Sequence, residues 1–235
     1  MIGLPKLTAV ELKLFLRDRV SLSFVLLWPS GILLLFGLIY GDAMTFLASL
    51  TVSISLGMVG LFTVPSYLSR DREVGILRRL STTPVHPVML LIAQLVIHLA
   101  MAVVSVILVI GVGHLVLAIA LPKNLVGFFA ALILGMAALI SVGLLIAAVA
   151  PNSRAASAIG PLVFWASLFF AGVWLPRDRM PDLLGRISDY TPLGATREML
   201  EASWAGGAPQ PLQLVAMALI TVVIGATAAR LFRWE

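Results

Sequence analysis

The sequence predicts an all-α integral membrane protein with six transmembrane helices, and three observations lead to this class. Sixty per cent of the 235 residues are hydrophobic and only 11% are charged, whereas a soluble domain carries roughly 25% charged residues. Six apolar runs each approach or exceed the about 20 residues needed to cross a hydrocarbon core of about 30 Å. The basic residues are concentrated between these runs, which is typical of residues that set membrane orientation.

The chain begins with a segment, residues 4–19, that is too charged to cross a membrane. At 100° per residue, Lys6, Lys13 and Arg17 fall within about 40° of one another on a helix, and leucine and phenylalanine occupy much of the remaining circumference. Such a pattern predicts an amphipathic helix in the cytoplasmic interface, with its basic stripe toward lipid headgroups. We call this segment the interfacial elbow.

The six spans follow in order and give a single transmembrane domain over residues 1–235. The first two spans occupy residues 20–68, the third to fifth residues 88–174, and the last residues 212–229. Only Gly41 and Asp42 separate the first two apolar runs, which predicts a tight hairpin. The expected limits of the runs are Val20–Tyr40, Ala43–Leu68, Val88–Val112, Leu125–Val149, Ala156–Trp174 and Leu212–Ala229.

The lysines and arginines predict the orientation of these spans. Eleven of the 16 basic residues fall on one side: Lys6, Lys13, Arg17, Arg19, Arg70, Arg72, Arg78, Arg79, Arg154, Arg230 and Arg233. The other five fall on the opposite side: Lys123, Arg177, Arg179, Arg186 and Arg197. The positive-inside rule therefore places both termini in the cytoplasm, as an even number of spans requires.

The outer connector, residues 175–211, has helical periodicity of its own. Leu183, Leu184, Ile187 and Tyr190 share one face before Thr191-Pro192 interrupts the pattern, and a second short helix is expected from Leu193 to Trp204. These two helical patterns predict short re-entrant helices that enter the outer leaflet of the membrane. Trp174, Tyr190 and Trp204 are expected at the membrane interface.

Motifs for catalysis or cofactor binding are not found. The chain has no G-x-x-x-x-G-K-[ST] phosphate loop and no cysteine, and His86, His98 and His114 lack a metal-site spacing. No nucleophile elbow surrounds the serines near His98, which argues against an intramembrane hydrolase. The spans lack mid-membrane Asp and Glu, which argues against an ion-coupled secondary carrier. We expect no catalysis, no metal and no cofactor in this chain.

The third span carries a polar stripe of Gln94, His98 and Ser105. Two interpretations remain open. In the first interpretation, the side chains form hydrogen bonds between helices, each worth about 0.6 kcal/mol, and so determine helix packing. In the second interpretation, they line a substrate path. Packing is the favoured interpretation.

The inner connector, residues 70–87, contains a short helical pattern that ends before Pro84. Leu77 and Leu80 are apolar residues among charged neighbours, an arrangement typical of an apolar anchor with a charged rim. The alternative is a solvated loop whose arginines only set topology.

The pattern Glu73-x-Gly75-x-Leu77-x-x-Leu80-x-x-x-Pro84 resembles the inner connector of ABC type-2 exporter permeases. One residue more than expected separates Leu80 from the proline. The elbow, with Glu11-Leu12-Lys13 and Arg17-Asp18-Arg19, is similar to that family's elbow. Further similarity lies in the outer segment, at Phe170–Pro176, Met180-Pro181 and Tyr190–Leu193.

This resemblance implies a permease subunit of an ATP-driven exporter in a bacterial inner membrane. Two permeases would pair, two separate ABC ATPase subunits holding ATP and Mg would dock beneath them, and a hydrophobic, amphipathic or lipid-linked substrate would be moved out. Membrane lipids are expected partners and nucleic acids are not. The expected ATPase-coupling residues are Arg72, Glu73, Gly75, Leu77, Arg78, Leu80 and Pro84. A cytochrome-biogenesis permease of the same ATPase-driven class is the nearest alternative.

Overall fold

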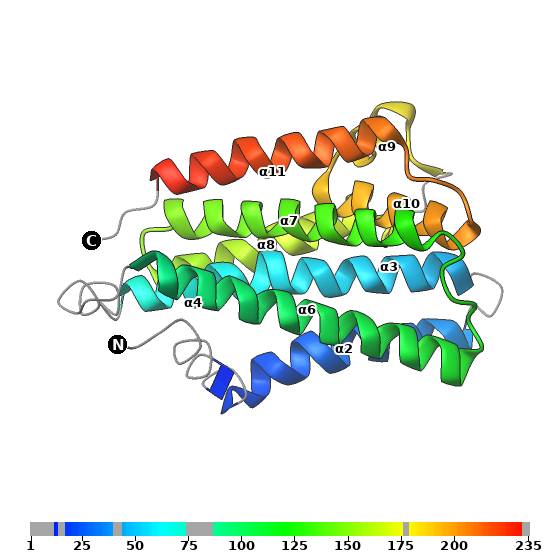
Figure 1. Cartoon of the computed structure of the whole chain (residues 1–235), viewed down its shortest axis with the longest axis horizontal. Coiled ribbons are helices and arrows are strands. Elements are labelled where there is room, and N and C mark those ends of the chain that lie inside the picture. The colour runs from blue at the N-terminus through cyan, green and yellow to red at the C-terminus, as the bar shows by residue number, and fades with distance from the viewer. Residues whose placement is uncertain (1–11, 14–16, 40–43, 74–86, 176–178, 232–235) are drawn as a thin grey trace.

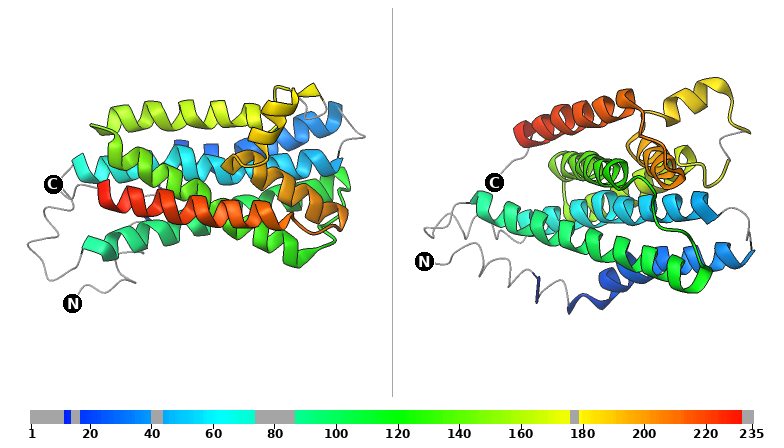
Figure 2. Two further views of the ribbon diagram at one scale, coloured as in Figure 1. Left: turned by 90° about the horizontal axis from the view of Figure 1, so that it is seen from above. Right: turned by 45° about the vertical axis from the view of Figure 1, so that its right-hand side comes forward.

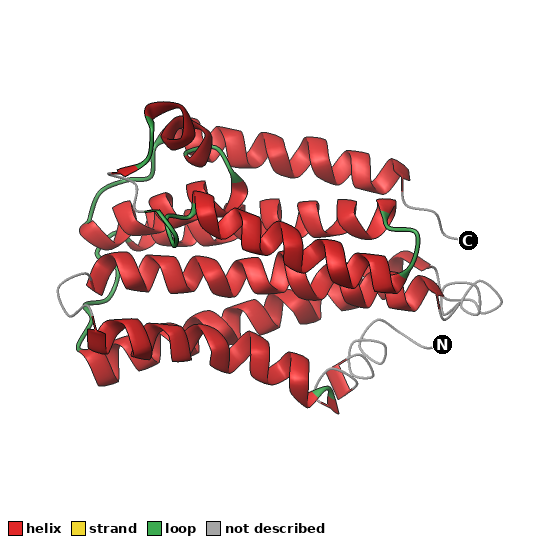
Figure 3. Ribbon diagram, turned by 180° about the vertical axis from the view of Figure 1, so that it is seen from behind, coloured by secondary structure: helices red, strands yellow, loops and turns green. Residues whose placement is uncertain are grey.

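The computed structural model describes residues 12–13, 17–39, 44–73, 87–175 and 179–231. Within these ranges all regular secondary structure is helical (Figure 3). The long helices run side by side, and the start of α2 and the end of α11 lie at the same end of the bundle (Figure 1).

Six helices are long and apolar enough to cross a membrane, which confirms the predicted number of spans. The second span is one continuous helix in three parts, α3, η1 and α4. The bounds of the spans are α2 Arg19–Ile39, α3 Met44–Gly57, η1 Met58–Thr63, α4 Val64–Glu73, α6 Pro87–Leu117, α7 Leu125–Val149, α8 Ser153–Phe170 and α11 Pro211–Leu231.

The C-terminal ends of the third and fifth spans differ from the expected ones for local reasons. Helix α6 continues beyond Val112 to Leu117 because the residues after His114 are again apolar. Helix α8 ends at Phe170 rather than Trp174. Gly172 has a φ of 82°, and the amide of Val173 donates to the carbonyl of Leu168. This left-handed glycine closes the helix end.

The second span is the centre of the bundle. Inside the protein, 94% of its most apolar stretch is buried, against 17% for α11. It packs against α2, α6, α7, α8 and α10, and both views of Figure 2 show it between its neighbours. Its buried hydroxyls bond back to carbonyls of their own helix, as Thr51 Oγ1 does to Leu47 at 2.7 Å. Most hydroxyls of this polar helix face are thereby satisfied within the helix, whereas the buried Ser69 hydroxyl of α4 has no hydrogen-bond partner among the described residues.

The π-helical stretch η1 brings the centre into backbone contact with two neighbours. A Cβ atom at Gly143 of α7 would lie 2.0 Å from the Gly60 carbonyl oxygen, and one at Gly160 of α8 would lie 2.4 Å from the Leu61 carbonyl oxygen. Pro65 has no N–H to donate to the Leu61 carbonyl four residues earlier. The amide of Val64, the residue before this proline, donates to the carbonyl of Val59, five residues earlier. The wide π-helical turn therefore ends immediately before Pro65.

The outer connector forms two short helices, α9 (Asp182–Ser188) and α10 (Pro192–Ala205). Their positions match the expected ones, and Leu183 of α9 is exposed. Helix α10 packs against α3, α7 and α8. The expectation for Trp204 was wrong. The side chain is only 4% exposed and lies inside the protein, because α10 is covered by the bundle instead of facing lipid.

Candidate coupling site

The end of α4 holds two charged residues that the sequence places in the predicted coupling segment. The residues of the inner connector predict a separate short helix that begins near Arg72, but Arg72 and Glu73 form the last turn of α4. Helix α4 extends to Glu73 because neither glycine nor proline occurs between Pro65 and Gly75. The second span and the first charges of the inner connector are therefore one rigid element.

Arg72 contacts the end of α7. Its guanidinium donates to the carbonyl of Ala147 at 3.2 Å and to the carbonyl of Ala150. The last carbonyls of a helix lack partners within the helix, and the negative end of the helix dipole favours a cation there. Arg72 thus caps α7 from a different span.

Glu73 contacts the start of α8. Its Oε2 accepts hydrogen bonds from the backbone N–H of Ser153, at 3.2 Å, and from the Ser153 hydroxyl. The same turn is capped by Asn152, whose side chain accepts from the amide of Ala155 at 2.8 Å. A carboxylate is favoured at a helix N-terminus, where amides are unpaired and the dipole is positive.

Two adjacent residues of opposite charge therefore bind opposite sides of one turn. We call this arrangement, Arg72 and Glu73 with Ala147, Ala150 and Ser153, the α4 clamp. Glu73 is exposed and Arg72 half-buried. The clamp ties three spans together at the end from which the inner connector leaves.

The remaining predicted coupling residues, Gly75, Leu77, Arg78, Leu80 and Pro84, lie outside the described residues, as does Lys6 of the elbow. Lys13 and Arg17 of the elbow are exposed. The elbow's end is joined to α4, because the Tyr67 hydroxyl donates to Asp18 Oδ2 at 2.6 Å. Sequence reasoning missed this bond and the role of Ser153. The Pro151-Asn152-Ser153 sequence signals a helix start but does not indicate its partner.

The polar stripe of α6 faces other helices. Ser105 is fully buried, and its hydroxyl donates to the Val25 carbonyl of α2 at 2.7 Å. His98 is 5% exposed, and its ring lies edge-on to Tyr67 with centroids 5.7 Å apart. The side chain of Gln94 lies outside the described part of the structure. The Ser105 and His98 contacts are of the kind expected for helix packing.

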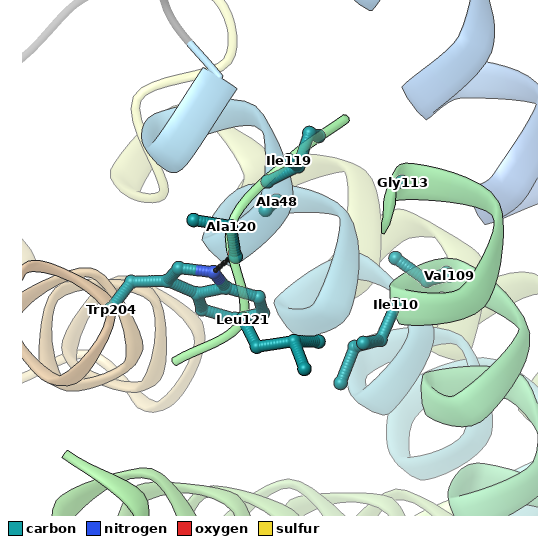
Figure 4. Close-up of a pocket in the computed structure, with 8 residues that line it drawn as sticks. All are labelled: Ala48, Val109, Ile110, Gly113, Ile119, Ala120, Leu121 and Trp204. Atoms are coloured by element: carbon teal, nitrogen blue, oxygen red, sulfur yellow. Dashed lines mark hydrogen bonds between the residues drawn. The ribbon is translucent and has the colours of Figure 1, made fainter. Parts of the chain in front are cut away.

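The opposite end of the bundle is held by buried contacts. Trp204 Nε1 donates to the carbonyl of Ala120 at 2.7 Å, which fixes α10 to the loop after α6 (Figure 4). The backbone amide of Asn124 donates to Ser203, and its side chain donates to Gly207. The cavity beside Trp204 has a volume of only about 10 Å³, barely that of one water. It has no room for a ligand.

Arg197 of α10 is a second feature that the sequence did not reveal. Its side chain is buried over the ring of Phe46, 5.3 Å from the guanidinium carbon to the ring centroid, and it pairs with Glu201. Glu198 accepts from Gln213 of α11 at 2.6 Å. This arginine was expected among the five basic residues of the outer side, within the short helix from Leu193 to Trp204. Its burial was not expected: it helps to bind α10 to α3, and its neighbour Glu198 binds α10 to α11.

No group of three or more His, Asp or Glu residues within the described ranges is arranged to hold a metal ion. The sequence matches the family described as ABC-2 type transporter over residues 6–203, from the elbow to the last turn of α10. None of the curated proteins matches the chain.

Proposed function

The chain belongs to the ABC-2 type transporter family, as a multi-pass transmembrane subunit that works with ABC ATPase subunits, and we propose that the α4 clamp transmits ATPase movement to its spans. The subunit itself is not catalytic and carries no cofactor. ATP and Mg would be held by the partner ATPase.

In this proposal two permeases pair and two ATPase subunits dock at the cytoplasmic side of a bacterial inner membrane. The complex exports a hydrophobic, amphipathic or lipid-linked substrate. The eleven-to-five distribution of basic residues supports cytoplasmic termini. Residues 70–87 would form the docking surface, with Leu77 and Leu80 as its apolar anchor, Arg78 at its rim, and Gly75 and Pro84 at its limits.

One observation supports the coupling role most directly: Arg72 and Glu73 contact both sides of the α7–α8 turn. A displacement of the part of the inner connector that follows Glu73 would act first on these two residues, because they immediately precede that part in the chain. The backbone contacts of η1 with α7 and α8 would transmit this displacement to the membrane-spanning parts of these helices. ATP binding would then favour one arrangement of the bundle over another, since the ATPase pair prefers one of them.

In this proposal, the polar stripe of α6 contributes to helix packing and not to a transport path. The Ser105 bond to Val25 and the His98 contact with Tyr67 hold α6 against α2 and α4. A transport path that includes Gln94, His98 and Ser105 stays a prediction.

The experiment uses the chain in nanodiscs with the ATPase that co-purifies with it at native expression levels. The cysteine-free sequence accepts a single cysteine at Ala158, an exposed position of α8, for an environment-sensitive fluorophore. We expect a non-hydrolysable ATP analogue to change its fluorescence. The double variant Arg72→Gln/Glu73→Gln should retain the ATPase but lose most of this change.

Two further variants separate docking from transmission. Leu77→Ala with Leu80→Ala should release the ATPase, because truncating a buried apolar anchor can cost about 2 kcal/mol of binding. Arg230→Gln, an exposed arginine at the end of α11, serves as the control and should change neither property. An impermeant thiol reagent should reach the Ala158 cysteine only from the cytoplasmic side. A full fluorescence response in the clamp variant would contradict the proposal.

A further inference from the structure

A polar cavity lies where the end of the elbow, α4 and α8 meet. It has a volume of about 200 Å³ and is lined by Asp18, Ser66, Tyr67, Arg70, Ser153 and Ser157. A single water needs about 10–15 Å³, so the cavity has room for a polar group of several heavy atoms. Every lining side chain can form hydrogen bonds, which makes this cavity suitable for a polar ligand.

The two charged groups of the lining differ in what already compensates their charge. Asp18 accepts a hydrogen bond from the Tyr67 hydroxyl at 2.6 Å, and it immediately precedes α2, where the positive end of the helix dipole favours a carboxylate. Arg70 is exposed and, within the described ranges, takes part in no ion pair and no side-chain hydrogen bond. Arg72, by contrast, caps α7, and Arg197 is paired within α10. The charge that the cavity offers to a ligand is therefore positive.

The serine hydroxyls of the lining divide into acceptors and a donor. Ser66 already donates to a carbonyl of its own span at 2.9 Å, and Ser153 donates to Glu73, so both offer a ligand the lone pairs of their oxygens. Ser157 is exposed, and its hydroxyl donates no hydrogen bond to any described residue. Its O–H is therefore available to an anion, in addition to the N–H groups of Arg70.

A phosphate that carries a hydroxylated substituent matches these partners. The planar guanidinium of Arg70 presents N–H donors in the geometry that binds two phosphate oxygens at once. The Ser157 hydroxyl can donate to a third oxygen. Hydroxyl groups next to the phosphate can donate to the oxygens of Ser66 and Ser153, which an ammonium-free, uncharged group does without repelling Arg70.

The surroundings of the cavity place it at the depth of lipid headgroups. Asp18 belongs to the elbow, whose basic stripe predicts a position in the membrane interface. Ser157 lies on a face of α8 that becomes apolar beyond the cavity, where Leu162 and Trp165 are 70% and 45% exposed. Trp165 follows Ser157 by eight positions, which is about two helical turns on the same side. A headgroup in the cavity would therefore have its acyl chains beside α8, in the bilayer.

We propose that this cavity binds the headgroup of one phospholipid of the phosphatidylglycerol type. The phosphate pairs with Arg70 and Ser157, and the glycerol hydroxyls donate to Ser66 and Ser153. The acyl chains stay in the bilayer along the apolar face of α8. An acidic side chain of the partner ATPase would pair with Arg70 but would leave the serine oxygens and this apolar face without a partner.

The test counts lipids bound to the intact chain by native mass spectrometry. Phosphatidylglycerol is compared with phosphatidylethanolamine, whose ammonium replaces the hydroxyl groups, and with diacylglycerol, which lacks the headgroup. The fourth probe is glycerophosphoglycerol, the soluble headgroup without acyl chains. We expect one tightly bound phosphatidylglycerol per chain, preferred about tenfold over each of the others. Tenfold is the order of one charge-assisted hydrogen bond.

Three variants assign the binding to the cavity. Arg70→Gln should weaken phosphatidylglycerol binding about tenfold, and Arg70→Lys should weaken it less, because lysine keeps the charge but not the planar set of donors. Ser157→Ala should weaken binding about threefold, as expected for one exposed hydrogen bond. Arg230→Gln, which removes an exposed positive charge at the same end of the bundle, is the matched control and should bind as the native chain does. Thermal unfolding verifies that each variant is folded.

Four results would overturn the proposal. Unchanged phosphatidylglycerol binding in Arg70→Gln would remove the site, and an equal loss in Arg230→Gln would reduce it to a general attraction of lipid to the basic end. Equally tight binding of glycerophosphoglycerol would show a site for soluble phosphate esters. Release of the ATPase by Arg70→Gln, with unchanged lipid binding, would assign the cavity to ATPase docking. Because the lipid count uses the chain without its ATPase, it does not depend on the α4 clamp.

Discussion

The centre of the bundle and the α4 clamp join the same three spans by different physical means. At the centre, η1 touches α7 and α8 through backbone atoms at Gly143 and Gly160. At the clamp, α4 meets the same two helices through the side chains of Arg72 and Glu73, which water can reach. The first contact cannot open without leaving a void, whereas the second can exchange its partners for water.

This difference assigns separate tasks to the two regions. Packed backbones hold the spans at fixed separation, since protein interiors are close-packed and resist deformation. Exposed hydrogen bonds contribute little to stability, because water competes for the same groups. The centre should therefore determine stability, and the clamp should determine how the spans respond to a partner.

The largest effect is expected from Gly143→Ala. The added methyl group would meet the Gly60 carbonyl oxygen, a backbone atom that cannot rotate away. Overpacking of this kind costs about 3 kcal/mol. Thermal unfolding in nanodiscs measures it. Gly31→Ala adds the same methyl group at an open position of α2 and should leave the unfolding temperature unchanged. Equal effects of the two substitutions would contradict the rigid centre.

A smaller effect is expected from Ser105→Ala, which removes the buried hydrogen bond between α6 and α2. Bonds between helices in membranes are worth about 0.6 kcal/mol on average, so the unfolding temperature should fall slightly. Thr227→Ala is the control, because Thr227 is exposed and bonds only within its own helix. Altered transport with unchanged stability would instead favour a substrate path along this face of α6.

The smallest effect on stability is expected from Ser153→Ala at the clamp. It removes the hydroxyl that donates to Glu73 but keeps the backbone amide as a donor. Thermal unfolding should not change measurably, whereas the nucleotide-dependent fluorescence at position 158 should decrease. A loss of stability as large as that of Gly143→Ala would show that the clamp belongs to the rigid framework.

Much of the fold follows from the sequence because the bilayer imposes simple rules. An apolar run of about 20 residues must become a helix, since lipid offers no partners to backbone groups. The number of spans, their order and the two short outer helices follow from run lengths and breaks. The fifth span was expected to begin at Ala156, whereas α8 begins three residues earlier, at Ser153, where Asn152 caps the helix.

The sequence does not show which faces meet. Tryptophan is a residue type expected at the membrane interface. Helix α10 nevertheless packs against α3, α7 and α8, and Trp204 is buried. Arg197 was expected only as one of the outer basic residues, but its side chain is buried over the ring of Phe46. A bilayer-facing helix and a protein-covered helix are both apolar, so hydropathy does not distinguish them.

The sequence by itself determined the class of protein, the six spans and the segment that resembles a coupling region. Only the tertiary structure decided that Arg72 and Glu73 form hydrogen bonds to opposite sides of the α7–α8 turn. It also decided that Asp18 and Arg70 line one cavity. Span formation depends on local composition. Partner choice depends on contacts between residues up to 84 positions apart, and only helix packing brings these residues together.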